Sequence, residues 1–222
     1  MNNWDPLFLS FRLSLITTFI LVLIGVPIAY WLACTKTRIK PVLESIISLP
    51  LVLPPSVLGF YLLLAFSPNN CFGKLLDTYF NIRLVFSFEG LILASVLYSL
   101  PFMIYPVQAG FQNLPASLKE ASYTLGISPF KTFLKVMIPN VKFALLSGIV
   151  LTFAHTIGEF GVVLMIGGNI PGISKVASIA IYDEVESMNY EAANFYAKIL
   201  VVASFIILLL LFGFNRKLVK KI

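Results

Sequence analysis

Five apolar stretches in the sequence are each long enough to cross a lipid bilayer. A hydrocarbon core about 30 Å thick requires about 20 helical residues. The five stretches run approximately from Leu13 to Cys34, Ser45 to Phe66, Phe88 to Gly110, Lys142 to Ile166 and Phe195 to Phe214. We therefore predict an all-α fold: a polytopic bundle of five transmembrane helices, in one domain over residues 1–222 with its core at about 11–214.

Composition excludes the main alternatives to a membrane protein. Hydrophobic residues make up 59% of the chain and charged residues 12%, whereas soluble domains average about 45–50% apolar and about 25% charged. The net charge of +6 could indicate a nucleic-acid surface, but the basic residues cluster at the ends of apolar runs, as topology signals do. We expect a multi-pass membrane protein that contacts lipid and no nucleic acid.

The basic residues also predict an orientation. An outside N-terminus places eleven of them on the cytoplasmic side and five outside, which favours N-out and C-in by the positive-inside rule. The first span lacks a preceding basic region and a small-residue cleavage site, so we expect a retained helix. The outer basic residues are Arg12, Lys74, Arg83, Lys175 and Lys198.

The sequence contains no short motif that indicates a disulfide, a metal site or a catalytic site. Cys34 and Cys71 are predicted on opposite sides of the bilayer, too far apart for a disulfide. One histidine and no cysteine cluster exclude the usual zinc and iron–sulfur ligand sets, so we expect no metal, cofactor or catalytic residue. The apolar segment from Val176 to Tyr182 is too short to span and is expected to be a short helix outside the membrane or dipping into it.

The stretch between the third and fourth spans, residues 114–139, predicts two short helices joined by a turn. We call this stretch the elbow. Ser117 and Glu120 have the spacing of a capping box, which predicts a helix start at about 117. Gly126 fits the left-handed residue that ends a helix.

The second helix of the elbow is expected to end near 139. Ser128 can cap its start, Pro129 suits its first turn, and Pro139 is expected to stop it. Apolar residues recur at helical spacing along both helices, so each can press an apolar stripe against a partner. These residues are Leu118, Ala121, Leu125, Phe130, Phe133 and Leu134.

The elbow resembles the EAA loop of bacterial ABC-importer permeases, whose pattern is E-A-A-x3-G-x9-I-x-L-P. Here Glu120-Ala121-Ser122 is followed at the matching spacings by Gly126 and by Val136-Met-Ile-Pro139. The resemblance implies a type I permease fold and coupling helices that dock into a cytoplasmic ATPase. An ordinary amphipathic connector is the alternative. The implied coupling residues are Glu120, Ala121, Ser122, Gly126, Pro129 and Pro139.

Three further stretches resemble the molybdate permease subunits within that family: residues 49–59, 158–161 and 169–172. The resemblance implies a homodimer, two copies of an ABC ATPase and an extracytoplasmic molybdate-binding protein. The chain has no G-x-x-x-x-G-K-[ST] motif, so a partner must bind the nucleotide. Tungstate or sulfate permeases are the near alternatives. A secondary transporter, which would show two related halves, is the alternative from another class.

Prolines and hydroxyl groups indicate the translocation pathway. Prolines in span two must break or bend it, and freed carbonyls are tolerated only against protein or a water-filled path; a packing kink is the alternative. A tetrahedral dianion calls for hydroxyl and amide donors. The pathway or gate candidates are Pro54, Pro55, Ser56, Ser99, Thr152, Thr156 and Glu159.

His155 and Glu159 are four residues apart and share one face of a continuous helix. Ionisable groups inside a membrane usually face the bundle interior. We favour a structural pair or a hydrogen bond near the gate, because Glu159 would repel an anion. A proton-coupled site and a direct contact with substrate remain alternatives.

Overall fold

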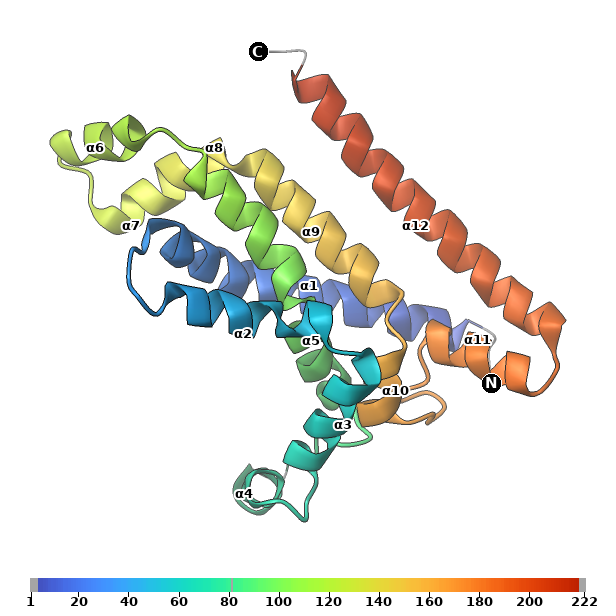
Figure 1. Ribbon diagram of the computed structural model, residues 1–222. Helices are drawn as coiled ribbons and strands as arrows, with labels where there is room; N and C mark the ends of the chain where they lie inside the picture. The colour runs from blue at the N-terminus through green and yellow to red at the C-terminus, as the bar shows by residue number, and fades with distance from the viewer. Residues whose placement is uncertain (1–3, 81, 220–222) are drawn as a thin grey trace.

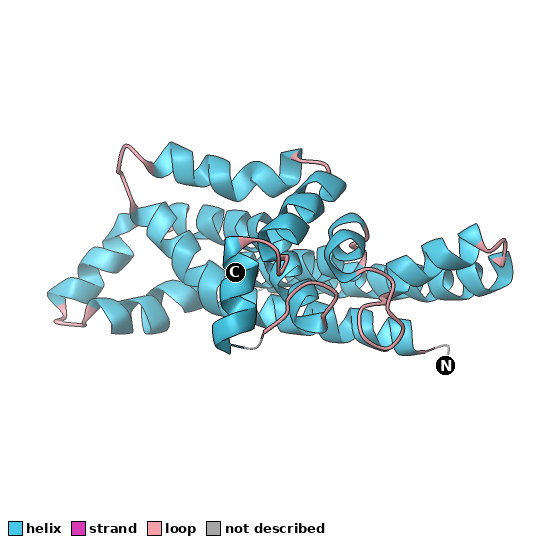
Figure 2. Ribbon diagram, turned by 90° about the horizontal axis from the view of Figure 1, so that it is seen from below, coloured by secondary structure: helices cyan, strands magenta, loops and turns pink. Residues whose placement is uncertain are grey.

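The computed structural model describes residues 4–80 and 82–219, and regular structure in this part of the chain is entirely helical (Figure 2). Three long helices are unbroken: α1 (Asp5–Cys34), α5 (Phe88–Gln112) and α12 (Tyr190–Val219). Each is apolar and long enough to cross a membrane, and two bent helix pairs raise the possible number of spans to five. The predicted all-helical membrane bundle is confirmed.

The core forms where α1, α5 and α9 (Lys142–Ile157) pack together (Figure 1). Met103, Ile104 and Val107 of α5 are fully buried there, together with Leu21 of α1. Partly buried side chains of α2 (Lys40–Val52) also pack against this cluster. The central helix α5 is therefore the scaffold on which the other elements are positioned.

Span two is a broken helix. It consists of α2 and α3 (Pro55–Phe66), and the helix axis bends by 111° between them. Leu53 has an extended backbone, as a residue before proline prefers, and Pro55 occupies the first turn of α3. The predicted break is confirmed at Pro54 and Pro55, whereas Pro50 lies inside α2 without ending it.

Span four is also interrupted, so the predicted continuous helix from Lys142 to Ile166 is wrong. Helix α9 ends at Ile157, and α10 (Gly161–Gly167) begins after three intervening residues. Glycines at both edges of this break favour an end of helical structure. Gly161 also permits a close approach to α3, because a Cβ there would lie 2.6 Å from the Cβ of Pro55.

Shorter helices cap the two ends of the bundle. At one end lie α6 (Ala116–Thr124), α7 (Pro129–Thr132), the π-helix η1 (Phe133–Met137) and α8 (Ile138–Asn140). At the other lie α4 (Cys71–Phe80) and α11 (Ala177–Glu186). Helix α11 confirms the short helix predicted from Val176 to Tyr182 and continues through the acidic residues to Glu186.

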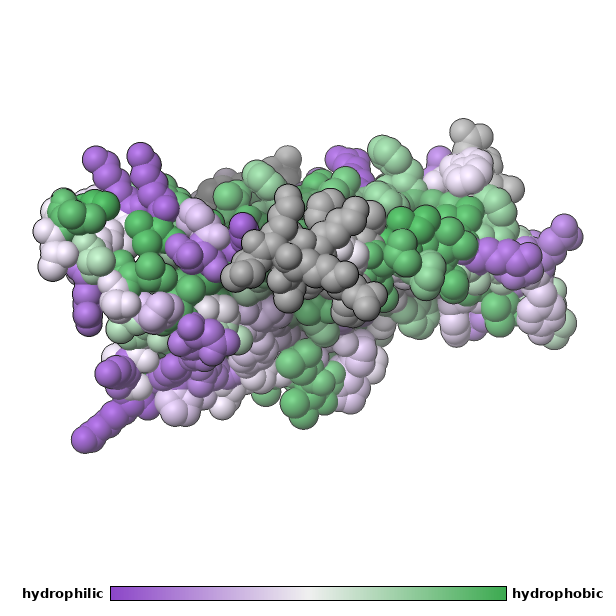
Figure 3. Space-filling model, turned by 90° about the horizontal axis from the view of Figure 1, so that it is seen from above, coloured by the Kyte–Doolittle hydropathy of each residue, from purple (hydrophilic) through white to green (hydrophobic). Residues whose placement is uncertain are grey.

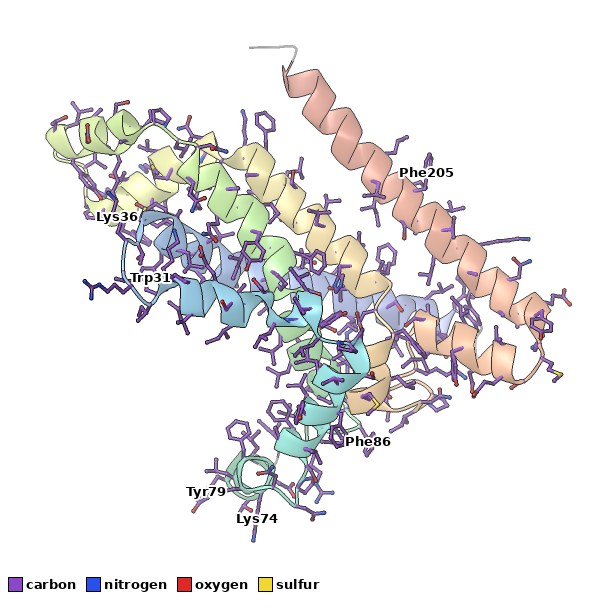
Figure 4. The ribbon with its side chains drawn as sticks, in the orientation of Figure 1. Trp31, Lys36, Lys74, Tyr79, Phe86 and Phe205 are labelled. Atoms are coloured by element: carbon purple, nitrogen blue, oxygen red, sulfur yellow. The ribbon has the colours of Figure 1, made fainter. Side chains whose placement is uncertain are left out.

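Polar residues mark these two ends. Hydrophilic residues gather at the end that carries α6 and α7 and again at the opposite end, with hydrophobic residues between them (Figure 3). Lys36 lies in the turn between α1 and α2 on the elbow side, whereas Lys74 lies on α4, far from it (Figure 4). This distribution agrees with a bilayer between the elbow and α4.

Candidate functional site

The elbow forms as two short helices, but its first helix begins differently from the prediction. Helix α6 starts at Ala116 with Pro115 before it, and no side chain caps its first turn. The predicted capping box of Ser117 and Glu120 is therefore wrong. Pro115 supplies an extended backbone (ψ 136°), so the helix begins without the Ser117 hydroxyl.

The end of α6 is the predicted glycine turn. Gly126 has a φ of 72°. Its N–H donates to the carbonyl of Tyr123 at 3.0 Å, and the N–H of Ile127 donates to the carbonyl of Ser122 at 3.1 Å. These two bonds define a Schellman motif, in which glycine relieves the strain of the left-handed residue. The turn assignment for Gly126 is confirmed.

The second helix of the elbow begins as predicted and ends slightly later. The Ser128 hydroxyl accepts from the N–H of Lys131 at 3.5 Å, and Pro129 occupies the first turn. Pro139 has no N–H to donate, and the five residues before Ile138 form a π-helix, which absorbs an irregular hydrogen-bond pattern. The helix ends at Asn140, so Pro139 lies inside its last turn.

A buried hydrogen bond holds the two helices of the elbow together. The hydroxyls of Ser122 and Thr132 are 2.7 Å apart, and both residues are almost fully buried. A buried hydroxyl pair resists separation because each hydroxyl would then be buried without a hydrogen-bond partner. Ser122 thus contributes to the shape of the elbow and does not contact solvent.

The outer surface of the elbow is apolar and exposed. Leu125 is 78% exposed and Phe130 70% exposed, and Tyr123 and Leu134 are also exposed. Glu120 and Ala121 lie on the surface of α6, and no ion pair found in the described residues involves Glu120. This face therefore combines apolar side chains with an available carboxylate, as a docking surface does.

The elbow is joined to the membrane helices by aromatic packing. The ring of Tyr30 in α1 lies 4.8 Å from Phe133 of the elbow and 5.1 Å from Phe111 of α5, between ring centroids. The ammonium group of Lys119 lies 5.8 Å from the ring centroids of both Tyr30 and Tyr123. Phe133 thus places the elbow in direct aromatic contact with α1 and α5.

The two broken spans meet in the half of the bundle away from the elbow, where α3 and α10 lie side by side (Figure 1). Helix α3 packs against α10, where Pro55 faces Gly161. Ser56 and Pro54 are exposed at the start of α3, and Pro55 is half-buried. Of the predicted pathway residues in span two, Ser56 therefore offers an accessible hydroxyl.

The other predicted hydroxyls are buried between α5 and α9. Ser99, Thr152 and Thr156 have at most 2% of their surface exposed. The Ser99 hydroxyl lies 3.1 Å from Nδ1 of His155 and 2.9 Å from the hydroxyl of Thr156, which donates to the carbonyl of Thr152 at 2.9 Å. The Ser99 and Thr156 hydroxyls therefore bond to each other across the two helices, whereas the buried Thr152 hydroxyl has no hydrogen-bond partner in the described structure.

The direction of this hydrogen-bond chain follows from proton counting. Each hydroxyl has one proton to donate. All three contacts are satisfied if His155 donates from Nδ1 to Ser99, Ser99 donates to Thr156, and Thr156 donates to the Thr152 carbonyl. The reverse direction satisfies only two of them. This series of hydrogen bonds therefore favours a proton on Nδ1 of neutral His155. The His155 ring also stacks on Phe102, with the ring centroids 3.9 Å apart.

His155 and Glu159 do not form the expected pair. The helix ends between them, and neither a hydrogen bond nor an ion pair joins them within the described structure. Oε1 of Glu159 instead accepts from the N–H of Val162 at 3.0 Å. A carboxylate in this position satisfies a free N–H and lies at the positive end of α10. The structural-pair hypothesis is wrong, and Glu159 acts as a cap for α10.

Two polar clusters were missed by the sequence reasoning. Oε1 of Glu44 in α2 accepts from Nε2 of Gln108 in α5 at 2.7 Å, beside an open cavity of about 510 Å³ that Ser45 and Ser48 also line. At the outer end, Lys175 pairs with Asp183, which also accepts from Asn169 at 3.0 Å. The bond from Lys175 lowers the pKa of Asp183 below its usual value. Glu44 and Gln108 are 64 residues apart in sequence, whereas Lys175 and Asp183 are eight apart.

Comparison with known proteins decides the family. Residues 25–222 match the family described as the binding-protein-dependent transport system inner membrane component. The chain belongs to this family. Among its members, the molybdenum transport system permease protein ModB of Azotobacter vinelandii is 43% identical over 94% of this chain and 92% of its own length. The sulfate transport system permease protein CysT of Escherichia coli is 31% identical over 93% of this chain and 74% of its own length.

Two solved structures have the same fold as this chain. A chain of the MetNI methionine ABC transporter, in inward-facing conformations, superimposes with a TM-score of 0.73 at 16% identity and covers 96% of this chain and 94% of its own. A chain of an amino acid ABC transporter superimposes with a TM-score of 0.64 at 22% identity, covering 97% and 93%. The type I permease fold is therefore confirmed for this family member.

Proposed function

We propose that this family member is the permease subunit of an ABC importer for molybdate in a bacterial cytoplasmic membrane. The observation that supports molybdate as the substrate is the 43% identity to ModB, which extends over almost the full length of both chains. The relatives named as sulfate permeases are about a third identical, so sulfate is the second candidate. Tungstate has the same tetrahedral dianionic chemistry and is not separated from molybdate by these residues.

The proposed mechanism depends on the elbow. Two ATPase subunits would dock on the elbows of a permease homodimer, whose Leu125 and Phe130 present exposed apolar side chains. Closure of the ATPases on ATP would move each elbow as one unit, because the Ser122–Thr132 hydrogen bond joins its helices. Tyr30 would pass this movement to the membrane helices. With the N-terminus outside, the elbow faces the cytoplasm, where ATP is available.

The proposed anion path lies near the place where the two broken spans meet. Ser56 would offer a hydroxyl there, and Glu159 would keep α10 in place without touching the anion. Ser99 and Thr156 would hold α5 against α9 as positioning residues, and Thr152 is buried beside them in α9. A molybdate-binding protein would deliver the anion to the outer surface formed by residues 67–87 and 169–192.

Co-purification tests the proposed partnership. A tagged chain expressed with its candidate ATPase should retain that ATPase in mild detergent. Glu120→Lys should lower the retained ATPase because it reverses the charge on the exposed face of α6. Glu191→Lys, at the far end of the molecule, is the matched control and should retain the wild-type amount. If both variants retain the same amount of ATPase, the elbow surface at Glu120 does not form part of the interface.

A further inference from the structure

We propose that a groove between α1 and α12 binds an anionic phospholipid, with its phosphate at Arg12. The groove encloses about 580 Å³. Its walls come from the first half of α1, the end of α9 and the adjoining part of α12, which stands apart from the bundle over much of its length (Figure 1). We call this space the α1–α12 groove.

The walls of the groove are apolar apart from one charge. Phe8, Phe11 and Leu15 of α1 are exposed, as is Trp4 just before the helix, and Arg12 is the charged residue among the described lining residues. Such a surface in a membrane is covered by hydrocarbon or by another protein segment. The positive charge of Arg12 is complemented by an occupant that carries an anionic group.

Arg12 has no carboxylate partner among the described residues. The ion pairs found in this part of the chain do not include it. Asp5 lies on the same helix, but seven residues earlier and therefore about 10 Å away along the axis. The guanidinium carbon instead lies 4.6 Å from the ring centroid of Phe88. A guanidinium in this state can bind a phosphate through two parallel hydrogen bonds.

The depth of Arg12 fits a headgroup. Phe88 is the first residue of α5 and of the predicted third span, so the guanidinium lies where the hydrocarbon core gives way to headgroups. Trp4 contacts Phe195 edge to face at 5.3 Å and closes the groove near the helix ends. Tryptophan is typical of this interfacial layer. From Arg12 an acyl chain can follow Leu15 toward the bilayer centre.

The groove of about 580 Å³ is open on one side. An acyl chain is much thinner than a helix, which is about 10 Å wide, so it can lie in the groove beside Arg12.

Native mass spectrometry of the purified full chain, titrated with phosphatidylglycerol and separately with phosphatidylcholine, tests the site. Arg12→Gln should weaken phosphatidylglycerol binding about tenfold or more, as the loss of one charged contact implies. Ala203→Trp should fill the groove and weaken the binding of both lipids. Lys74→Gln, which removes an outer charge far from the groove, is the control and should bind like the wild type.

Three results would overturn the proposal. If Arg12→Gln binds phosphatidylglycerol with unchanged affinity, the headgroup does not bind at Arg12. If Lys74→Gln weakens phosphatidylglycerol binding as much as Arg12→Gln does, the effect would reflect the net charge of the protein and not a site at Arg12. Dissociation of dimers by Ala203→Trp with unchanged lipid binding would assign the groove to a second copy of the chain. If Ala203→Trp does not fold, Arg12→Lys gives a second test, with expected affinity between the wild type and Arg12→Gln because the charge remains and the paired hydrogen bonds are lost.

Discussion

Ser122 and Thr132 share a buried hydrogen bond of 2.7 Å that joins the two helices of the elbow. The family pattern places alanine at position 122, so the hydroxyl is a departure from that pattern with a partner of its own. Because the bond is internal to the elbow, it allows α6 and α7 to move as one body. In the proposed importer, this rigidity would let the elbow pass the movement of an ATPase to the membrane helices.

The Ser122–Thr132 bond predicts non-additive mutations. Ser122→Ala leaves a buried Thr132 hydroxyl without its partner and should lower the free energy of unfolding by about 1 to 3 kcal/mol. Thr132→Val in the Ser122→Ala background should recover part of that loss, because both polar groups are then gone. Denaturant titration of the purified variants measures the cycle. Losses that simply add would show that the two hydroxyls do not interact.

Gly126 predicts a defect in coupling. Its φ of 72° strains a residue with a Cβ by about 1 kcal/mol or more, although a Cβ there would meet no other atom within 4 Å. Gly126→Val should lower the oxyanion transported per ATP hydrolysed at normal membrane abundance. Gly126→Asn, which tolerates this backbone region, should retain more. Wild-type coupling in the valine variant would contradict the proposed role of the turn.

Glu159 predicts a difference between two substitutions. Glu159→Gln keeps an oxygen that can accept from the N–H of Val162, whereas Glu159→Ala removes this cap of α10 at a cost of about 1 kcal/mol. Uptake of labelled oxyanion, normalised to abundance, should stay high in the glutamine variant and fall in the alanine variant. If both lose transport equally at normal abundance, a proton-coupled role replaces the capping role.

The single histidine of the chain allows a direct spectroscopic test. The hydrogen-bond chain through Ser99 and Thr156 predicts that neutral His155 carries its proton on Nδ1. Nitrogen-15 NMR of the histidine-labelled protein should show this tautomer, and Ser99→Ala should shift the population toward Nε2–H. A predominant Nε2–H form in the wild type would contradict the proposed donor–acceptor direction of these hydrogen bonds.

Local signals explain why much of the elbow could be predicted. Gly126, Ser128 and Pro129 act through backbone conformation and neighbouring N–H groups, so their roles depend on a few adjacent residues. The apolar lengths of the spans likewise reflect the thickness of the bilayer. The capping box of Ser117 and Glu120 failed because Pro115 started the helix one residue earlier.

Contacts between distant segments explain what could not be predicted. His155 and Glu159 share a face only on an unbroken helix, and the break at residues 158–160 sent their side chains to different partners. The bond between Glu44 and Gln108 spans 64 residues of sequence, and no local pattern indicates it. The packing of α3 on α10, which brings Pro55 to Gly161, depends in the same way on tertiary structure.

Reconstituted uptake tests the central claim most directly. The chain, its ATPase and its binding protein would be assembled in proteoliposomes and supplied with radiolabelled molybdate, with ATP on the side of the elbow. The account predicts molybdate accumulation that requires ATP and all three proteins and that excess sulfate does not suppress. Accumulation driven by an ion gradient without ATP, or transport of sulfate in preference to molybdate, would contradict it.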